Sequence, residues 1–212
     1  PLGVAGQQRL DKLRRDASEL AIKLAPWCEG EPQRLEVRQR IELSAGTLEL
    51  SGWLDGLYGG RLVRCRPSQV QGRDRLATWV EHLVYCAQYP VADATVYRGL
   101  SGEVLFRPMA PSDARSELRG LLEIWLQGQT QPLPFDPQTG WAYISEREAD
   151  EDKARDKAQQ RFEGGFRQHG VLEDPYISRV FPTFSVYWPG LQHYSEQILM
   201  PMQAQLEDIK DD

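Results

Sequence analysis

Cysteine and histidine are scarce in this sequence, which has only three of each among 212 residues. Cys28, Cys65 and Cys86 are odd in number and widely spaced, whereas disulfide frameworks and zinc sites need cysteines in pairs at short intervals. Three histidines do not supply the missing ligands. We therefore expect reduced thiols in a cytoplasmic protein, with no metal or other cofactor.

Long apolar runs and an excess of positive charge are also missing. No run of about 18 apolar residues is present, so no segment is expected to span a membrane. No charged start followed by an apolar stretch resembles a signal peptide. The formal net charge is -6, whereas free-standing DNA-binding proteins are usually basic. Any contact with nucleic acid is therefore expected to be local or shared with partner proteins.

What is present is enough apolar sequence for a core, since hydrophobic residues make up 41% of the chain. Their spacing predicts an α/β fold: a helix, a three-strand antiparallel meander, a second helix, two short strands and further helices. The expected strands cover residues 34–43, 47–54, 61–66, 93–98 and 103–107. The expected helices cover residues 9–25, 73–88, 112–127 with Ser112 as cap, a stretch opened by a capping box at 145–148, and 194–209.

The hairpin SGWLDGLYGGRLVRCRP at residues 51–67 resembles the active-site hairpin of PD-(D/E)xK nucleases. In that fold an Asp follows the second strand and a D/E-x-K triplet lies on the third. The two carboxylates bind Mg²⁺ and the lysine steadies the attacking water. Asp55 falls at the first position, but the triplet reads Arg64-Cys65-Arg66. The two arginines are expected to repel Mg²⁺ and to pair with Asp55 or hold a phosphate.

The helix after this hairpin allows more than one interpretation. Recombination nucleases of this fold carry Gln and Tyr one turn apart on it, and Glu81 and Tyr85 occupy those positions. An ordinary amphipathic helix with Glu81, His82 and Tyr85 on its polar face explains the pattern as well. An active Mg²⁺-dependent nuclease also remains open, with Asp55 joined by an unrecognised second carboxylate such as Glu49 or Glu81.

Taken together, several segments resemble one family. WVEHLVYCA at 79–87, the hairpin, LPFDPQTGWAY at 133–143 and the later FEGG and DPYISRVF segments are similar to the C-terminal domain of the exodeoxyribonuclease V gamma subunit, RecC. The resemblance runs from about residue 9 to the end. It implies a degenerate PD-(D/E)xK fold without an active site. It also implies a non-catalytic scaffold that works with the RecB and RecD subunits in double-strand-break repair and recombination.

With this resemblance the chain is expected to divide into four parts. Residues 1–8 would be a tag remnant or disordered lead, 9–130 a nuclease-like α/β core, 131–143 a proline-rich loop, and 144–212 a helical extension packed on the core. The loop carries Phe135 and Trp141, which are candidates for contact with a partner subunit.

A run of arginines is the candidate surface for DNA, because guanidinium groups bind phosphate well. The candidates are Arg61, Arg64, Arg66, Arg73 and Arg75. Ion pairing with carboxylates elsewhere in this acidic chain is an equally open interpretation. The aromatic-rich stretch from Tyr176 to Tyr194 is expected to fill core space rather than to stack on bases.

Overall fold

The computed structural model describes residues 3–165 and 168–209 and has the expected α/β fold. Its sheet has six strands in the order β1-β2-β3-β4-β5-β6. The strands are β1 (Gln33–Leu43), β2 (Gly46–Tyr58), β3 (Arg61–Cys65), β4 (Thr95–Gly99), β5 (Gly102–Phe106) and β6 (Leu206–Ile209). The helices are α1 (Val4–Leu24), α2 (Gly72–Gln88), α3 (Pro111–Gly128), α4 (Pro137–Arg147), α5 (Glu151–Glu163), α6 (Pro175–Val180) and α7 (Phe184–Gln205), with short 3-10 turns at Ala25–Trp27 and Val171–Glu173.

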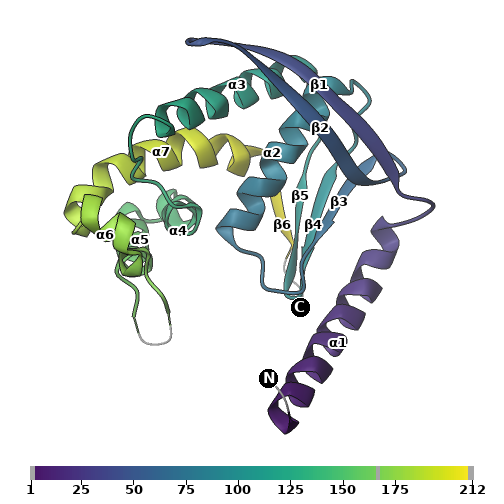
Figure 1. Cartoon of the computed structure of the whole chain (residues 1–212), viewed down its shortest axis with the longest axis horizontal. Coiled ribbons are helices and arrows are strands. Elements are labelled where there is room, and N and C mark those ends of the chain that lie inside the picture. Colours follow the sequence, from purple (N-terminus) through teal and green to yellow (C-terminus); the bar gives the residue numbers. More distant parts are fainter. Residues whose placement is uncertain (1–2, 166–167, 210–212) are drawn as a thin grey trace.

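The first three strands form the antiparallel meander that the alternation predicted. Val37, Ile41 and Leu43 of β1 point into the core, because successive side chains of a strand alternate between its faces. β2 is longer than expected and pairs with β3 only beside the turn. Most of the β1–β2 ribbon therefore extends past the rest of the sheet, across α2 and α3 (Figure 1).

Helix α2 connects β3 to β4, and these two strands run parallel. A parallel pair requires such a crossover. The expected buried stripe is confirmed at Trp79, Leu83 and Ala87, whereas Val80 is 36% exposed. α2 lies between the sheet and the group of α3, α4 and α7 (Figure 1). The junction of β3 and α2 lies at one end of the sheet (Figure 1).

The expected proline-rich loop at 131–143 is wrong in its second half, because α4 begins at Pro137. Asp136 caps this helix, with its Oδ1 accepting a hydrogen bond from the backbone N–H of Thr139 at 2.8 Å. Proline at the first helical position loses no intrahelical hydrogen bond, so Pro137 opens a helix instead of preventing one. Trp141 consequently lies on a helix and not on a loop.

Other helix ends also differ from the expectation. Ala110 caps α3 in place of Ser112, and Asp150 caps α5 in place of the capping box expected at Ser145. The last helix begins at Phe184 rather than 194, although it contains Pro189 and Pro201. It ends at Gln205, and residues 206–209 form a strand that pairs with β5. Most of the aromatic stretch fills core space as expected, with Phe184 and Tyr187 buried against Phe162, but Tyr176 is 80% exposed.

Helix α1 projects away from the other elements (Figure 1). It begins at Val4, so residues 4–8 are helical and not a disordered lead, while residues 1–2 lie outside the described part. This first turn contains Val4 and Gly6, which are poor helix formers, and has no apolar periodicity, which is why the pattern missed it. Trp27 attaches this end of the chain to the sheet by donating from Nε1 to Glu103 Oε2 at 2.7 Å. No helix in residues 3–165 or 168–209 is long and apolar enough to cross a membrane.

A candidate site at the junction of β3 and α2

The residues of the nuclease-like pattern come from three neighbouring elements. Asp55 lies on β2, Arg64 on β3 and Glu81 on α2, and the hairpin turn brings the two strands together. Tyr85 fixes this turn, since its hydroxyl donates to the backbone carbonyl of Gly60 at 2.6 Å. Tyr85 is therefore buried and bound to the hairpin instead of lying on an exposed polar face. Burial raises the pKa of its hydroxyl.

The guanidinium of Arg64 fills the space between β2 and α2. Its Nη1 donates to the backbone carbonyl of Asp55 at 2.7 Å, and its Nε donates to the Glu81 carboxylate. Gly56 makes room for it: a Cβ there would lie 3.1 Å from Arg64 Nη1, and the backbone φ of +70° also favours glycine. A cation thus lies where the expected metal site would need a carboxylate ligand.

The carboxylate of Asp55 does not take part in this arrangement. It is 68% exposed and pairs with Arg34 Nε at 2.9 Å. The expectation that Arg64 or Arg66 pairs with the Asp55 side chain is therefore wrong. Arg64 bonds only to the backbone carbonyl oxygen of Asp55 and not to its carboxylate.

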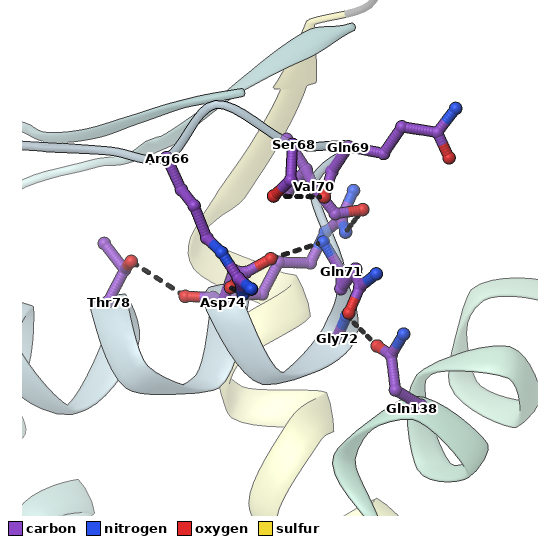
Figure 2. A network of polar contacts seen from close by, with 10 residues as sticks. Arg66, Ser68, Gln69, Val70, Gln71, Gly72, Asp74, Thr78 and Gln138 are labelled. Carbon is purple, nitrogen blue, oxygen red and sulfur yellow. Dashed lines mark hydrogen bonds and ion pairs between the residues drawn. The ribbon is translucent and has the colours of Figure 1, made fainter. Parts of the chain in front are cut away.

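Arg66 pairs instead with Asp74, at 3.4 Å from Nη1 to Oδ1 (Figure 2). Asp74 is only 8% exposed and lies in the first turn of α2. Its Oδ2 accepts a hydrogen bond from the backbone N–H of Gln71 at 3.0 Å, which satisfies a donor just before the helix. A negative charge here also suits the helix dipole. Asp74 therefore fixes both the start of α2 and the position of Arg66.

A hollow of about 200 Å³ lies between these two ion pairs. Tyr97 of β4 forms one wall, directly beside Arg64 in the parallel ladder. Its hydroxyl is buried without a hydrogen-bond partner among the described residues. Burial raises the pKa of this hydroxyl, and the nearby Asp74 carboxylate raises it further. Each cation lining the hollow is matched by a carboxylate, so the hollow has little net charge.

No group of three or more His, Cys, Asp or Glu side chains in residues 3–165 and 168–209 is arranged to hold a metal ion. Neither of the two other carboxylates considered for such a site is placed to join Asp55. Glu81 is bound to Arg64. Glu49 is opposite Arg40 in the β1–β2 ribbon, six residues from Asp55 along β2, which corresponds to roughly 20 Å.

The remaining candidate arginines are mostly occupied by carboxylates. Arg61 pairs with Asp93 at 3.2 Å, and Arg75 pairs with Asp208 at 2.6 Å. The Arg75 side chain is only 9% exposed. Arg73 is exposed on the first turn of α2. Within the described part of the chain, the five arginines thus form four separate ion pairs and one exposed cation, and not one continuous basic surface.

The two candidates for partner contact lie in different places. Phe135 is half-buried and lines an apolar groove between α2 and α3. Trp141 is half-buried on α4, with the Arg75 guanidinium 4.7 Å above its ring. Neither side chain is fully exposed.

Sequence reasoning missed three residues that shape this region. His82 was expected on a polar face but is completely buried, with its Nδ1 2.8 Å from the hydroxyl of Thr95. Asp74 could have been found from its spacing, because it lies three residues after the helix cap Gln71. Tyr97 carries no local signal, since only the pairing of β3 with β4 brings it to the site.

Comparison with known proteins identifies the family. The model of the RecC C-terminal domain matches residues 1–148. The RecBCD enzyme subunit RecC of Escherichia coli K12 is 26% identical over 214 residues, covering 95% of this chain and 19% of that protein. The RecC subunits of Mycolicibacterium smegmatis and Mycobacterium tuberculosis H37Rv are 29% and 27% identical, each covering 72% of this chain and 14% of the relative. The chain thus spans about a fifth or less of the length of these relatives, and it belongs to the RecC C-terminal domain family.

Proposed function

We propose that this chain is a non-catalytic, nuclease-like scaffold domain of a bacterial ATP-dependent helicase–nuclease of the RecBCD type, acting in double-strand-break repair and recombination. Arg64 carries the proposal. Its guanidinium bonds to the backbone of Asp55 and to the carboxylate of Glu81. A divalent cation entering this space would meet a fixed positive charge and a carboxylate that is already paired.

The order of the elements supports a PD-(D/E)xK-like ancestry for the core. An antiparallel meander is followed by α2 and then by a strand parallel to β3. Asp55 and Glu81 remain near the positions that carboxylates and polar side chains take in such nucleases. This combination fits an ancestral site that has lost its second metal ligand and its lysine.

The alternative of an active Mg²⁺-dependent nuclease is not favoured. It needs a second carboxylate close enough to Asp55 to share a metal ion. Glu81 is bound to Arg64, and Glu49 is roughly 20 Å away along the strand. The Asp55 carboxylate is itself paired with Arg34.

Contact with DNA is a second part of the proposal, and the exposed cations carry it. The side chain of Arg66 is 48% exposed despite its pairing with Asp74, and Arg73 is exposed nearby on α2. Arg61, Arg64 and Arg75 would contribute only if their carboxylate partners were displaced. Exposed cations of this kind bind phosphates of the DNA backbone and do not distinguish one base sequence from another.

The proposed partners are the RecB and RecD subunits together with the rest of RecC. An apolar groove of about 470 Å³ between α2, α3 and α7 offers a surface for one of them. Trp125 in this groove is 51% exposed and Val80 is 36% exposed, and Leu133 and Phe135 also line it. Exposed aromatic side chains in a concave apolar surface are typical of protein interfaces.

The assembly proposal is tested by co-purification of the tagged chain with RecB and RecD of the same organism. We expect both subunits to be retained, and Trp125→Glu to reduce retention about tenfold, because a charge would be buried in the interface. Val91→Glu is the matched control, since Val91 is 88% exposed outside the groove. If neither subunit is retained by the unmodified chain, the scaffold proposal fails.

A further inference from the structure

The outer edge of β1 is closed by side chains at two places and is open between them. β1 is the first strand of the sheet, so one of its edges has no neighbouring strand. The Gln88 amide takes the place of a strand in the first half of β1. It accepts a hydrogen bond from the backbone N–H of Arg38 at 3.0 Å and donates one to the backbone carbonyl of Glu36 at 2.7 Å. Just beyond the far end of β1, the backbone N–H of Ser44 donates to Glu123 Oε1 at 2.6 Å.

The part of β1 between these two closures has unpaired backbone groups on its outer edge. The N–H and C=O groups of successive residues in a strand point to opposite edges. Those of Arg40 and Glu42 therefore point to the same edge as the N–H groups of Arg38 and Ser44. No residue in the ranges 3–165 and 168–209 forms a hydrogen bond with these outward groups. Such a row of groups is a template on which another chain can add a strand.

A cleft of about 560 Å³ lies along this open stretch, between β1 and the start of α3. The wall formed by α3 is a single face of the helix, because its residues recur at a spacing of three or four. These residues are exposed, and they are Ser112, Arg115, Ser116 and Arg119. The cleft therefore leaves space directly beside the unpaired backbone groups of β1.

The charge around this cleft is mostly positive. Four arginines line it, and they are Arg38, Arg40, Arg115 and Arg119. Of these, only Arg38 forms an ion pair within the described part of the chain, with Glu36 at 2.8 Å. Glu42 is the single carboxylate among the lining residues. Three cations without an ion pair thus surround the open edge of a chain whose net charge is -6. They repel a basic segment and attract an acidic one.

We propose that the open edge of β1 binds an extended acidic segment of another protein, which adds to the sheet as a further strand. The segment pairs with the backbone groups of Arg40 and Glu42. Because the side chains of a strand alternate between its faces, carboxylates at every second position lie together on the side of the α3 arginines. Nucleic acid would use the guanidinium groups, but it has no regular row of donors and acceptors that matches a strand edge. The inference goes beyond the proposed function, since it requires neither RecB nor RecD.

Fluorescence anisotropy with a labelled peptide of alternating Glu and Thr, about eight residues long, tests this edge directly. The titration uses the full chain, the variant Arg115→Glu and the control Arg15→Glu. Arg15 is exposed on α1, so the control makes the same change in charge away from the cleft. We expect Arg115→Glu to weaken binding about tenfold, because a carboxylate replaces one of the cations beside the segment. Arg15→Glu should bind as the unmodified chain does, and a peptide with Lys in place of Glu should not bind.

A methylated peptide separates strand addition from attraction between charges. Methyl groups on all of its backbone nitrogens remove the donors that pair with β1 but leave every carboxylate in place. We expect this peptide to bind the unmodified chain at least about tenfold more weakly than its unmethylated parent, because main-chain hydrogen bonds supply much of the affinity of an added strand. This comparison needs no protein variant, so it holds even if Arg115→Glu fails to fold.

Three results would overturn the proposal. The first is equal affinity for the methylated and unmethylated peptides, since charge alone would then hold the segment. The second is equal loss of affinity in Arg115→Glu and Arg15→Glu, or no binding by the unmodified chain at all. The third is Arg115-dependent binding of an oligothymidylate, or Arg115-dependent self-association of the chain, without binding of the peptide. Co-purification with RecB and RecD is read separately, so failure at this edge and failure of the scaffold proposal are distinguishable.

Discussion

At the scale of single residues, Arg64, Arg66 and Tyr85 of the nuclease-like pattern each join two elements of the fold. Arg64 joins β2 to α2, Arg66 joins β3 to the first turn of α2, and Tyr85 joins α2 to the hairpin turn. These contacts give the three side chains a structural role that does not depend on catalysis. Replacing one partner leaves a charge without its counterpart, so each position has a structural consequence of its own.

The substitution of Arg for a carboxylate and for lysine could be predicted from the sequence, but the contacts of these arginines could not. The hairpin pattern placed Asp55 and Arg64 side by side. Which carboxylate each arginine meets depends on how α2 packs against the hairpin, because Asp74 and Glu81 both lie on that helix. The same limit applies to His82, whose helical position is local but whose burial depends on Thr95 and Phe106.

His82 predicts a dependence of stability on pH. Burial lowers the pKa of its imidazole from 6.5 to about 4, so it is neutral in the folded chain. As the pH falls below 6.5, the unfolded chain binds a proton that the folded chain does not. This contribution to the free energy of unfolding is fully present above pH 6.5 and is lost down to about pH 4, by about 3 kcal/mol in total.

Urea denaturation between pH 4 and pH 7 measures this effect. His82→Gln should be less stable than the unmodified chain at neutral pH, but its stability should fall less steeply as the pH is lowered. His193→Gln is the control, because His193 is exposed on α7. Equal slopes for the unmodified chain and His82→Gln would contradict the burial of a neutral imidazole.

At the scale of elements, the close contact of α2 with α4 fixes the start of α2, where Asp74 of the candidate site lies. Gly72 opens α2 directly against Pro137 and Trp141 of α4. The pattern of α2 was predicted correctly, because its apolar stripe is long and regular. α4 was missed because Pro137, the prolines before it and Gly140 were interpreted as breaks, although Pro137 and the Asp136 cap are typical of a helix start.

Two glycine-to-alanine substitutions test this contact. A Cβ on Gly72 would lie 2.3 Å from the backbone carbonyl oxygen of Pro137, so α2 and α4 must separate. We expect Gly72→Ala to lower the free energy of unfolding by about 2 kcal/mol. Gly120 on α3 faces open space, and Gly120→Ala should raise it by about 0.5–1 kcal/mol because alanine favours the helix. Urea denaturation distinguishes the two, and equal effects would be inconsistent with a tight contact.

At the scale of the whole molecule, the C-terminal region belongs to the same sheet as the meander. β6 follows α7 directly and pairs with β5, and Asp208 on β6 binds Arg75 of α2. The helical extension predicted for 144–212 therefore ends in a strand at the edge of the sheet. A four-residue strand has too short a pattern to be recognised, and its pairing depends on β5, about 100 residues earlier. The division of the chain at 130 and 144 remains a prediction.

The most direct test of the central claim is a nuclease assay on the purified chain. Single- and double-stranded DNA are incubated with Mg²⁺ and with Mn²⁺, and Asp55→Ala is assayed beside the unmodified chain. A domain in which Arg64 lies where a carboxylate ligand of the metal is needed should cleave neither substrate, and the two proteins should be indistinguishable. Cleavage by the unmodified chain that is lost in Asp55→Ala would contradict the account, because it would require a second metal ligand and a functioning site.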